Sequence, residues 1–372
     1  MGNMTSSAHT SSPASTPDAL WERYSRQILF APLGRAGQEK LAQAHVAIVG
    51  CGALGSAQAA LLTRAGVGRL TLIDRDYVEW SNLQRQALFD EDDARQGLPK
   101  VIAASRRLQA TNSAIHLTLH CTDLIPANID ALLGDAQVIL DGTDNFETRY
   151  LLNDFSIARG IPWIYGAAVG SYGASFTILP GETACLECIF DEKPTGATET
   201  CDTAGVLGWI IEWIAAVQVS ECIKLLVGAR EALRSSLLAA DLWKNEFQQL
   251  RQPARRHDCR ACGQRDFVHL RGDHRPPVTL CGRNAVQIHE HQHPLQLPEL
   301  AERLRPHGDV RSNDFVLRFI PREGWASSGD APGEEDEPAI CEMTVFPDGR
   351  ALIKGTTEPA VARSVYARYI GS

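Results

Sequence analysis

The sequence lacks the features that would direct a chain into a membrane or a secretory route. Residues 1–20 are rich in Ser, Thr, Ala and Pro and have no apolar stretch, so they form no secretory signal. We expect this segment to be a disordered tail. The longest apolar run, residues 209–227, is interrupted by Glu212, Glu221 and Lys224, which a bilayer disfavours. We therefore expect a buried amphipathic helix there and no contact with a membrane.

The chain also lacks an excess of positive charge. Lys and Arg number 36 against 45 Asp and Glu, a formal net charge of −9. Because a nucleic-acid-binding face needs clustered cations, this balance argues against nucleic acid as a partner. The ten cysteines, with no secretory signal before them, indicate a reducing, cytoplasmic location. There, paired cysteines are more often metal ligands than disulfides.

The 372 residues suffice for one large domain and a smaller second one. We expect the first over residues 21–270 and the second over 278–372, because His, Arg and Pro crowd the stretch between them. The second is predicted to be a small α+β unit that ends in a hairpin and a helix. Its acidic insert, near residues 327–338, is expected to be disordered.

The first domain alternates apolar strands with helical segments. Residues 45–49 (HVAIV) and 69–74 (RLTLID) are predicted strands, connected by a glycine-rich loop and a helix. The alternation continues through predicted strands at 116–120 and 136–141. This order predicts an α/β fold: a Rossmann-like, doubly wound, mostly parallel sheet.

The connecting loop, residues 50–55 (GCGALG), has a spacing that suits nucleotide binding. Gly50 allows the tight turn, Gly52 lets a ligand approach the backbone, and Gly55 lets helix and strand pack closely. The helix after the loop would present backbone N–H groups to an anion. Asp74, at the end of the second strand, is placed to bind ribose hydroxyls. Glycines that serve only as turns are the alternative.

Taken alone, the loop also fits an NAD- or FAD-dependent oxidoreductase. Its surroundings favour a triphosphate with magnesium, because cations spread phosphate charge and an Asp can hold the metal. The charged groups come from residues 23–27 (RYSRQ), 74–86 (DRDYVEWSNLQRQ), Lys100 and 144–149 (DNFETR). Each alone fits a solvated surface group equally well, so the prediction depends on the whole set.

The same segments, together with residues 141–145 (DGTDN), resemble the MoeB/ThiF family, which includes the adenylation domains of ubiquitin-activating enzymes. The resemblance covers about residues 21–263 and implies a nucleotidyltransferase. The implied site comprises the phosphate-binding Arg26, Arg85 and Lys100, the magnesium-binding Asp144, and the nucleotide-binding Asp74, Asp76, Asn82 and Gln86. A homodimer is also implied, in which the arginine matching Arg85 reaches the partner's site.

The implied reaction is attack of a carboxylate on the α-phosphorus of ATP, with pyrophosphate as the leaving group. A carboxylate is already ionised at neutral pH, so no general base is needed. Catalysis would consist of positioning and charge neutralisation by Arg26, Arg85, Lys100 and magnesium.

Two Cys-x-x-Cys pairs, Cys185 with Cys188 and Cys259 with Cys262, match a tetrahedral zinc site of four thiolates. All four positions are protein ligands, so the zinc is expected to be structural. It would tie the end of the first domain to its middle. The alternative is a set of unrelated reduced thiols.

Cys201 lies in a polar loop just before the long helix, where a thiol has favoured thiolate character. By position alone it fits an ordinary loop cysteine equally well. In the sulfur-carrier activators that the chain resembles, a cysteine at this point attacks the acyl-adenylate or joins the carrier in an acyl persulfide. The resemblance therefore implies a catalytic role for Cys201.

The resemblance implies a small ubiquitin-like sulfur carrier protein, ending in Gly-Gly, as the partner. A cysteine desulfurase is a candidate sulfur donor. The second unit, with residues 281–288 (CGRNAVQI) and 346–355 (FPDGRALIKG), resembles the extension of longer bacterial ThiF-type enzymes. This favours the carrier of thiazole (thiamine) synthesis. MoeB-like activation of the small subunit of molybdopterin synthase is the alternative.

Overall fold

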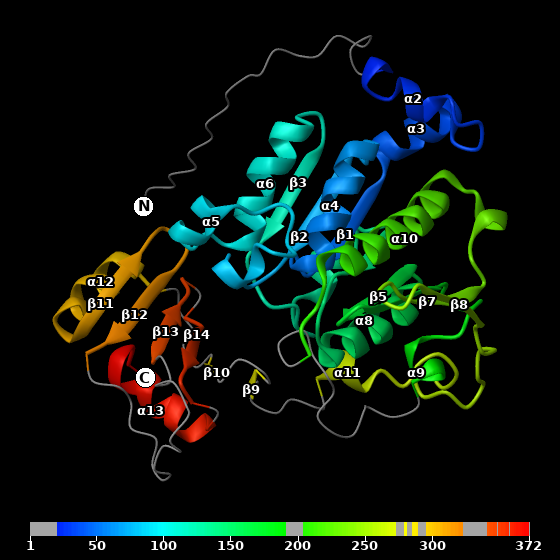
Figure 1. Cartoon of the computed structure of the whole chain (residues 1–372). Helices are drawn as coiled ribbons and strands as arrows, with labels where there is room; N and C mark the ends of the chain where they lie inside the picture. The colour runs from blue at the N-terminus through cyan, green and yellow to red at the C-terminus, as the bar shows by residue number, and fades with distance from the viewer. Residues whose placement is uncertain are drawn as a thin grey trace, which may run out of the picture.

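The computed structural model describes residues 21–190, 204–272, 279–280, 285–288, 295–322, 341–347, 349–356 and 358–371. The predicted tail at 1–20, the acidic insert near 327–338 and Cys201 lie outside the described residues. Two sheets organise the described part of the chain, and the smaller unit stands beside the larger one (Figure 1).

The first sheet has eight strands in the order β3-β2-β1-β4-β5-β6-β7-β8. Its parallel part contains β1 (His45–Val49), β2 (Arg69–Ile73), β3 (His116–His120), β4 (Val138–Asp141) and β5 (Trp163–Val169). The antiparallel part adds β6 (Tyr172–Ile178), β7 (Ser236–Asp241) and β8 (Glu246–Arg251). The predicted Rossmann-like, mostly parallel sheet is confirmed.

Helices cover both faces of this sheet, as expected for a doubly wound fold. The longer ones are α3 (Gly34–Gln43), α4 (Ala53–Ala65), α6 (Lys100–Thr111), α8 (Phe146–Arg159) and α10 (Gly208–Val227). The short ones are α2 (Ser25–Ile28), α5 (Glu91–Gln96), α7 (Ile129–Leu133), α9 (Leu186–Ile189), α11 (Val268–Arg271), η1 (Trp80–Asn82) and η2 (Arg230–Ala232). One apolar core lies under α4 and α6, and a second, with Phe155 and Trp163, lies under α8.

The predicted amphipathic helix is α10, which packs against α4, β5 and β6. Its Ile210, Ile214 and Gln218 are fully buried. Among the described residues, none of the helices is long and apolar enough to cross a membrane.

The second sheet is antiparallel, with six strands in the order β11-β12-β13-β14-β10-β9. They are β9 (Thr279–Leu280), β10 (Ala285–Ile288), β11 (Gly308–Ser312), β12 (Leu317–Pro321), β13 (Glu342–Val345) and β14 (Ala351–Lys354). The helices of this unit are α12 (Leu297–Leu304), η3 (Arg305–His307) and α13 (Pro359–Tyr369). Phe319, Met343 and Tyr366 are fully buried in its core. The predicted hairpin (β13–β14) and final helix (α13) are both present.

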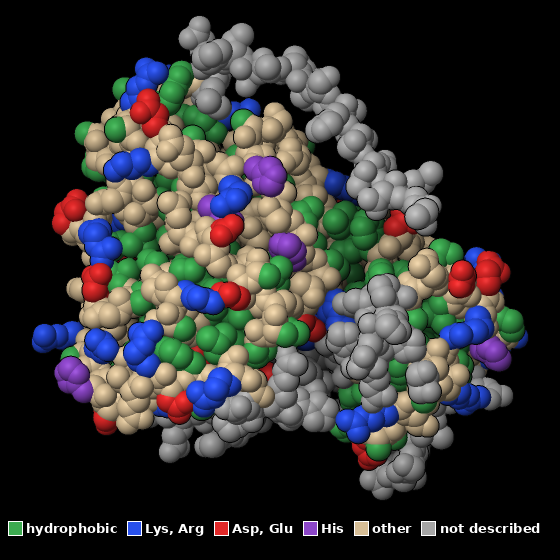
Figure 2. Space-filling model, turned by 180° about the vertical axis from the view of Figure 1, so that it is seen from behind, with side chains coloured by type: hydrophobic (Ala, Val, Ile, Leu, Met, Phe, Trp, Pro, Cys, Tyr) green, Lys and Arg blue, Asp and Glu red, His purple; other side chains and the backbone are tan. Residues whose placement is uncertain are grey.

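The second unit contacts the first where the chain leaves β2. Tyr77 of the first unit forms a small apolar cluster with Val316 and Phe346 of the second. On the face shown in Figure 2, the described Lys and Arg side chains are interspersed with Asp and Glu on both lobes. This mixed surface agrees with the charge balance of the sequence.

Candidate active site

The glycine-rich loop joins β1 to α4, and two of its glycines are required by the packing of the chain itself. Gly50 has a positive φ of 86°, and a Cβ built on it would lie 2.5 Å from the carbonyl oxygen of Gly142. A Cβ on Gly55 would lie 1.8 Å from the carbonyl oxygen of Gly50. Side chains at these two positions would therefore separate the helix from the strands.

Gly52 is different, because the protein leaves the space beside it open. The nearest atom to a Cβ built there is Nε2 of Gln86, at 3.9 Å, and the φ of −81° lies outside the left-handed range that requires glycine. Gly52 is also the N-cap of α4, and no side chain caps this helix. The first N–H groups of the helix therefore face this space and can bind an anion.

Asp74 follows β2 and is held against the glycine loop. Its Oδ2 accepts a hydrogen bond of 2.7 Å from the backbone N–H of Cys51, and its Oδ1 accepts one of 2.7 Å from Asp76. Burial raises the pKa of the Asp74 carboxyl, and Lys100 acts against this rise. The carboxylate thus has a fixed position at the edge of the loop, as ribose binding requires.

Lys100 begins α6 and is almost completely buried, at 4% exposure. Its Nζ lies 3.1 Å from Oδ2 of Asp76, and its backbone N–H donates to the carbonyl of Asp76. The sequence places these residues 24 positions apart, and the fold brings both to the end of β2. Their pairing keeps a cation beside Asp74.

The segment after β2 returns toward the glycine loop through η1. The buried Asn82 accepts a hydrogen bond of 3.0 Å from the backbone of Glu79. Arg85 is half-buried and donates to the carbonyl of Ser81 at 2.7 Å. Gln86 is buried beside Gly52, and within the described part of the chain its Oε1 has no hydrogen-bond partner. A buried acceptor without a partner, next to open space, fits a donor group of a bound nucleotide.

Asp144 is exposed at the end of a loop that follows β4. The loop is fixed by the buried Asp141, whose Oδ1 accepts bonds from the backbone N–H (2.9 Å) and hydroxyl (2.7 Å) of Thr143. Arg149 donates to Asp141 and to the carbonyls of Thr143 (2.7 Å) and Gly166 (3.0 Å). The sequence grouped Arg149 with the phosphate-binding cations, but its guanidinium holds this loop instead.

The site residues named from the sequence fall into two places. Most of them belong to the segments that follow the carboxyl ends of β1, β2 and β4, where α/β folds bind ligands. These residues are Gly52, Asp74, Asp76, Lys100, Asn82, Arg85, Gln86 and Asp144. Arg26 lies elsewhere. It is exposed on α2, and its neighbour Gln27 donates to the carbonyl of Ala65, at the far end of α4 from Gly52 (Figure 1).

The distance between Arg26 and the glycine loop follows from helix geometry. Helix α4 has 13 residues, and at 1.5 Å per residue its ends are about 20 Å apart. A single arginine side chain cannot span that length. Within one chain, Arg26 therefore does not join the other predicted phosphate-binding residues.

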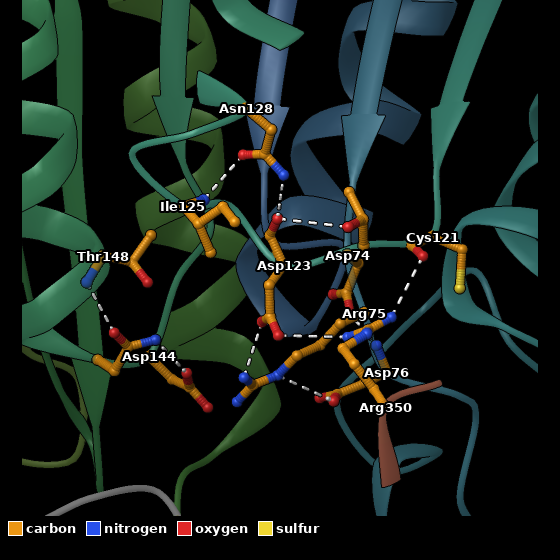
Figure 3. A network of polar contacts seen from close by, with 12 residues as sticks. Asp74, Arg75, Asp76, Cys121, Asp123, Ile125, Asn128, Asp144, Thr148 and Arg350 are labelled. Atoms are coloured by element: carbon orange, nitrogen blue, oxygen red, sulfur yellow. Dashed lines mark hydrogen bonds and ion pairs between the residues drawn. The ribbon is translucent and has the colours of Figure 1, made fainter. Parts of the chain in front are cut away.

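The sequence reasoning did not identify one contact beside the site, between Asp123 and Arg350. Asp123 follows β3, and Arg350 directly precedes β14 in the other unit; their side chains meet at 3.3 Å. Figure 3 shows both beside Asp74, Asp76 and Asp144. The only available signal was that Asp123 follows a predicted parallel strand, as Asp74 does.

The four cysteines predicted to bind zinc come together. The Sγ atoms of Cys185, Cys188, Cys259 and Cys262 all lie within 4.8 Å of one another, and all four residues are buried. A hydrogen bond from Cys185 lowers the pKa of the Cys188 thiol, which favours the thiolate that metals bind. The donor set, four sulfurs with no other ligand type, fits a closed structural zinc site.

The cysteine cluster is braced by Arg260. This side chain lies between Cys259 and Cys262 in sequence and pairs with Glu187 and with the buried Asp154 of α8 (3.2 Å). The cluster is therefore attached to the body of the first unit as well as closing on itself.

The ThiF family matches residues 24–261. The chain belongs to the ThiF family. It is 45% identical over 353 residues to the sulfur carrier protein ThiS adenylyltransferase of Bacillus subtilis (strain 168), covering 94% of this chain and 99% of that one.

Further relatives match a smaller share of the chain. The sulfur carrier protein adenylyltransferase of Thermus thermophilus is 35% identical over 257 residues, or 66% of this chain and 94% of that one. The adenylyltransferase and sulfurtransferase MOCS3 of Sus scrofa is 39% identical over 247 residues, and the match spans only 54% of its length. The crystal structure of E. coli MccB with ATP shares the fold, with a TM-score of 0.56 and 24% identity over 65% of this chain and 74% of that one.

Proposed function

We propose that this ThiF-family chain uses ATP to adenylate the C-terminal Gly-Gly carboxylate of a small ubiquitin-like sulfur carrier protein. One observation carries the proposal: the open space at Gly52 is bordered by Gln86, whose buried acceptor has no partner among the described residues, and by the fixed carboxylate of Asp74. These groups are suited to a ribose and its phosphates. Membership of the family supports ATP as the nucleotide.

The residues of the chain have separate tasks in this reaction. Asp74 binds the ribose, while Lys100, Arg85 and the N-terminus of α4 neutralise phosphate charge. Asp144, exposed at its loop end, would hold magnesium, which supplies further neutralisation of the phosphates. The carrier carboxylate attacks the α-phosphorus, an acyl O–P bond forms, and the P–O bond to pyrophosphate breaks. The attacking group is already an anion, so no protein base is required.

The position of Arg26 bears on assembly. If it binds phosphate, as the family resemblance implies, it does so in the site of a second copy, because its own site is a helix length away. Arg85, in contrast, belongs to the segment after β2 that also carries Asn82 and Gln86 of the same chain. We therefore propose a homodimer in which Arg26, rather than Arg85, is exchanged between copies.

The carrier of thiazole synthesis is the proposed substrate. The match to the ThiS adenylyltransferase covers 94% of the chain and so includes the second unit, whereas the match to MOCS3 covers 66%. Activation of a molybdopterin synthase subunit stays the alternative. Cys201 is proposed to form the covalent adduct with the carrier, with a cysteine desulfurase as the sulfur donor. A cytoplasmic location is proposed as well, because ten cysteines that include two Cys-x-x-Cys pairs suit a reducing compartment.

The proposal is tested by pyrophosphate exchange. The full chain is incubated with ATP, magnesium, labelled pyrophosphate and a ThiS-type carrier, and label in ATP is counted. We expect exchange that requires the carrier and disappears when its last glycine is removed. Absence of exchange, together with tight binding of NAD or FAD and none of ATP, would establish the oxidoreductase alternative instead.

A further inference from the structure

Arg350 of the second unit reaches the end of β3 in the first. The residue is 3% exposed, its Nη1 lies 3.3 Å from Oδ2 of Asp123, and its Nη2 donates to the carbonyl of Cys121 at 3.4 Å. Figure 3 shows this guanidinium entering the group of acidic side chains beside Asp74. One side chain of the second unit therefore fixes the loop after β3.

Asp123 is shared between Arg350 and the nucleotide site. Its second oxygen, Oδ1, accepts a hydrogen bond of 2.8 Å from Nη1 of Arg75. The Nε of Arg75 lies 3.7 Å from Oδ1 of Asp76. Asp76 in turn pairs with Lys100 at 3.1 Å. Charges thus alternate without interruption from Arg350 to Lys100.

The links of this network are shielded from water. The side chains of Arg75, Asp76 and Asp123 are about one-quarter exposed (23–26%), and that of Lys100 is 5% exposed. Ion pairs in such surroundings are screened less than surface pairs, and members of one network depend on each other. Removing Arg350 would take one cation away from Asp123, which changes the charge balance along this series of contacts.

A second contact of the second unit holds the segment after β2. Nζ of Lys354 lies 2.7 Å from Oε1 of Glu79, whose backbone N–H donates to Asn82. In the same segment, the ring of Tyr77 lies 4.0 Å from the guanidinium carbon of Arg318. The strand end that carries Asp74 and Asp76 is thus clamped by the second unit.

We propose that Arg350 is a positioning residue of the ATP site, acting through Asp123 and Arg75 on Asp76 and Lys100. The inference rests on the proposed function. It makes the second unit a structural part of the nucleotide site, although Arg350 itself directly precedes β14 in the other sheet. If Arg350 and Asp123 only held the two units together, the Asp123 carboxylate would not need to bind Arg75 as well.

The test measures ATP binding by calorimetry on the full chain with magnesium present. We expect Arg350→Met to weaken ATP binding about tenfold, the scale of coupling within one polar network. Arg350→Lys keeps the positive charge but loses the two-pronged guanidinium group. Its ATP affinity should therefore fall between those of the wild type and Arg350→Met. The matched control is Arg303→Met, because Arg303 also donates two bonds, to the carbonyls of Tyr369 and Ile370, but only inside the second unit.

A relay through Asp123 predicts a further result. Asp123→Asn should weaken ATP binding by a similar factor, and the double variant with Arg350→Met should bind no worse than either single one. The proposal is overturned if folded Arg350→Met binds ATP within twofold of the wild type. It is also overturned if Arg303→Met loses as much ATP affinity as Arg350→Met. If Arg350→Met does not fold, Arg350→Lys and Asp123→Asn decide by the same criterion. Failure of the proposed function is distinct, because the wild type itself would then bind no ATP.

Discussion

Asp141 and Arg149 form a buried ion pair, with 3.1 Å between Oδ2 and Nε, at the base of the loop that presents Asp144. Burial raises the pKa of the Asp141 carboxyl, and the Arg149 guanidinium opposes this by stabilising the charged form. Asp141 ends β4 and Arg149 lies near the start of α8, one on each side of Asp144 in the chain, so the position of an exposed side chain depends on two buried ones.

Replacement of Arg149 by Leu should destabilise the fold strongly. It leaves the carboxylate of Asp141 buried without its partner, a change that costs about 3–5 kcal/mol in other proteins. Urea unfolding of the purified variant measures the loss. Arg159→Ala is the control, since the Arg159–Asp130 pair is more than half exposed, and it should cost about 1 kcal/mol or less. Equal losses in both variants would contradict the structural role of Arg149.

Gly52→Ala and Gly55→Ala should separate binding from folding. A methyl group on Gly52 meets only Gln86, at 3.9 Å, so the variant should fold normally while its ATP affinity falls. On Gly55 the methyl would overlap the carbonyl of Gly50, so that variant should lose stability. Thermal unfolding and ATP calorimetry on the two variants give the comparison. A Gly52→Ala protein with wild-type ATP affinity would remove Gly52 from the site.

Asp144→Ala should abolish most pyrophosphate exchange without changing stability. The side chain is exposed, so its loss leaves no cavity, but the proposed magnesium loses its protein ligand. We expect a fall in the exchange rate of about 10²–10³, the scale for removing one transition-state-stabilising group. Glu147→Ala is the control because Glu147 is also acidic and exposed, three residues further on. Similar rates in both variants would count against a metal at Asp144.

Cys259→Ser should release zinc and lower the melting temperature. The change removes one of four sulfurs that lie within 4.8 Å of one another. Metal content per chain, measured by plasma emission spectroscopy, should fall from about one zinc to none. Cys222→Ser is the control, because Cys222 is fully buried in the core away from the cluster. It should lose stability but keep its zinc.

Cys201→Ser should keep pyrophosphate exchange and lose any covalent adduct with the carrier. Exchange needs only adenylation, whereas the adduct needs a thiol nucleophile. Mass spectrometry of the enzyme after reaction with ATP, carrier and a sulfur donor reads out the adduct. An adduct that persists in the variant would assign the reaction to another cysteine.

The sequence predicted those parts of the fold that are marked by buried apolar runs. Strands β1 and β4 stand out because each is a buried, mainly apolar run that is followed by a glycine. Strand β8 was not predicted, because all six of its residues are exposed and show no apolar alternation. Helices α5 and α7 have six and five residues, too few for a helical period to be visible.

The site was predictable where its residues adjoin strand ends in sequence. Asp74 follows β2 directly and Asp144 lies three residues after the end of β4, so their place at the edge of the sheet follows from the parallel order. The location of Arg26 depends on how α2 packs against the end of α4, which no local pattern encodes. The contact of Asp123 with Arg350 joins residues 227 positions apart, between two separate sheets.

The four-cysteine cluster closes the chain into a ring. The segment enclosed between Cys188 and Cys259 contains α10, β7 and β8. A single cleavage of the backbone anywhere between Cys188 and Cys259 would leave two polypeptides, each with one Cys-x-x-Cys pair. With zinc bound, the nicked protein should therefore elute as a single particle in gel filtration. A strong chelator should weaken the association of the two fragments.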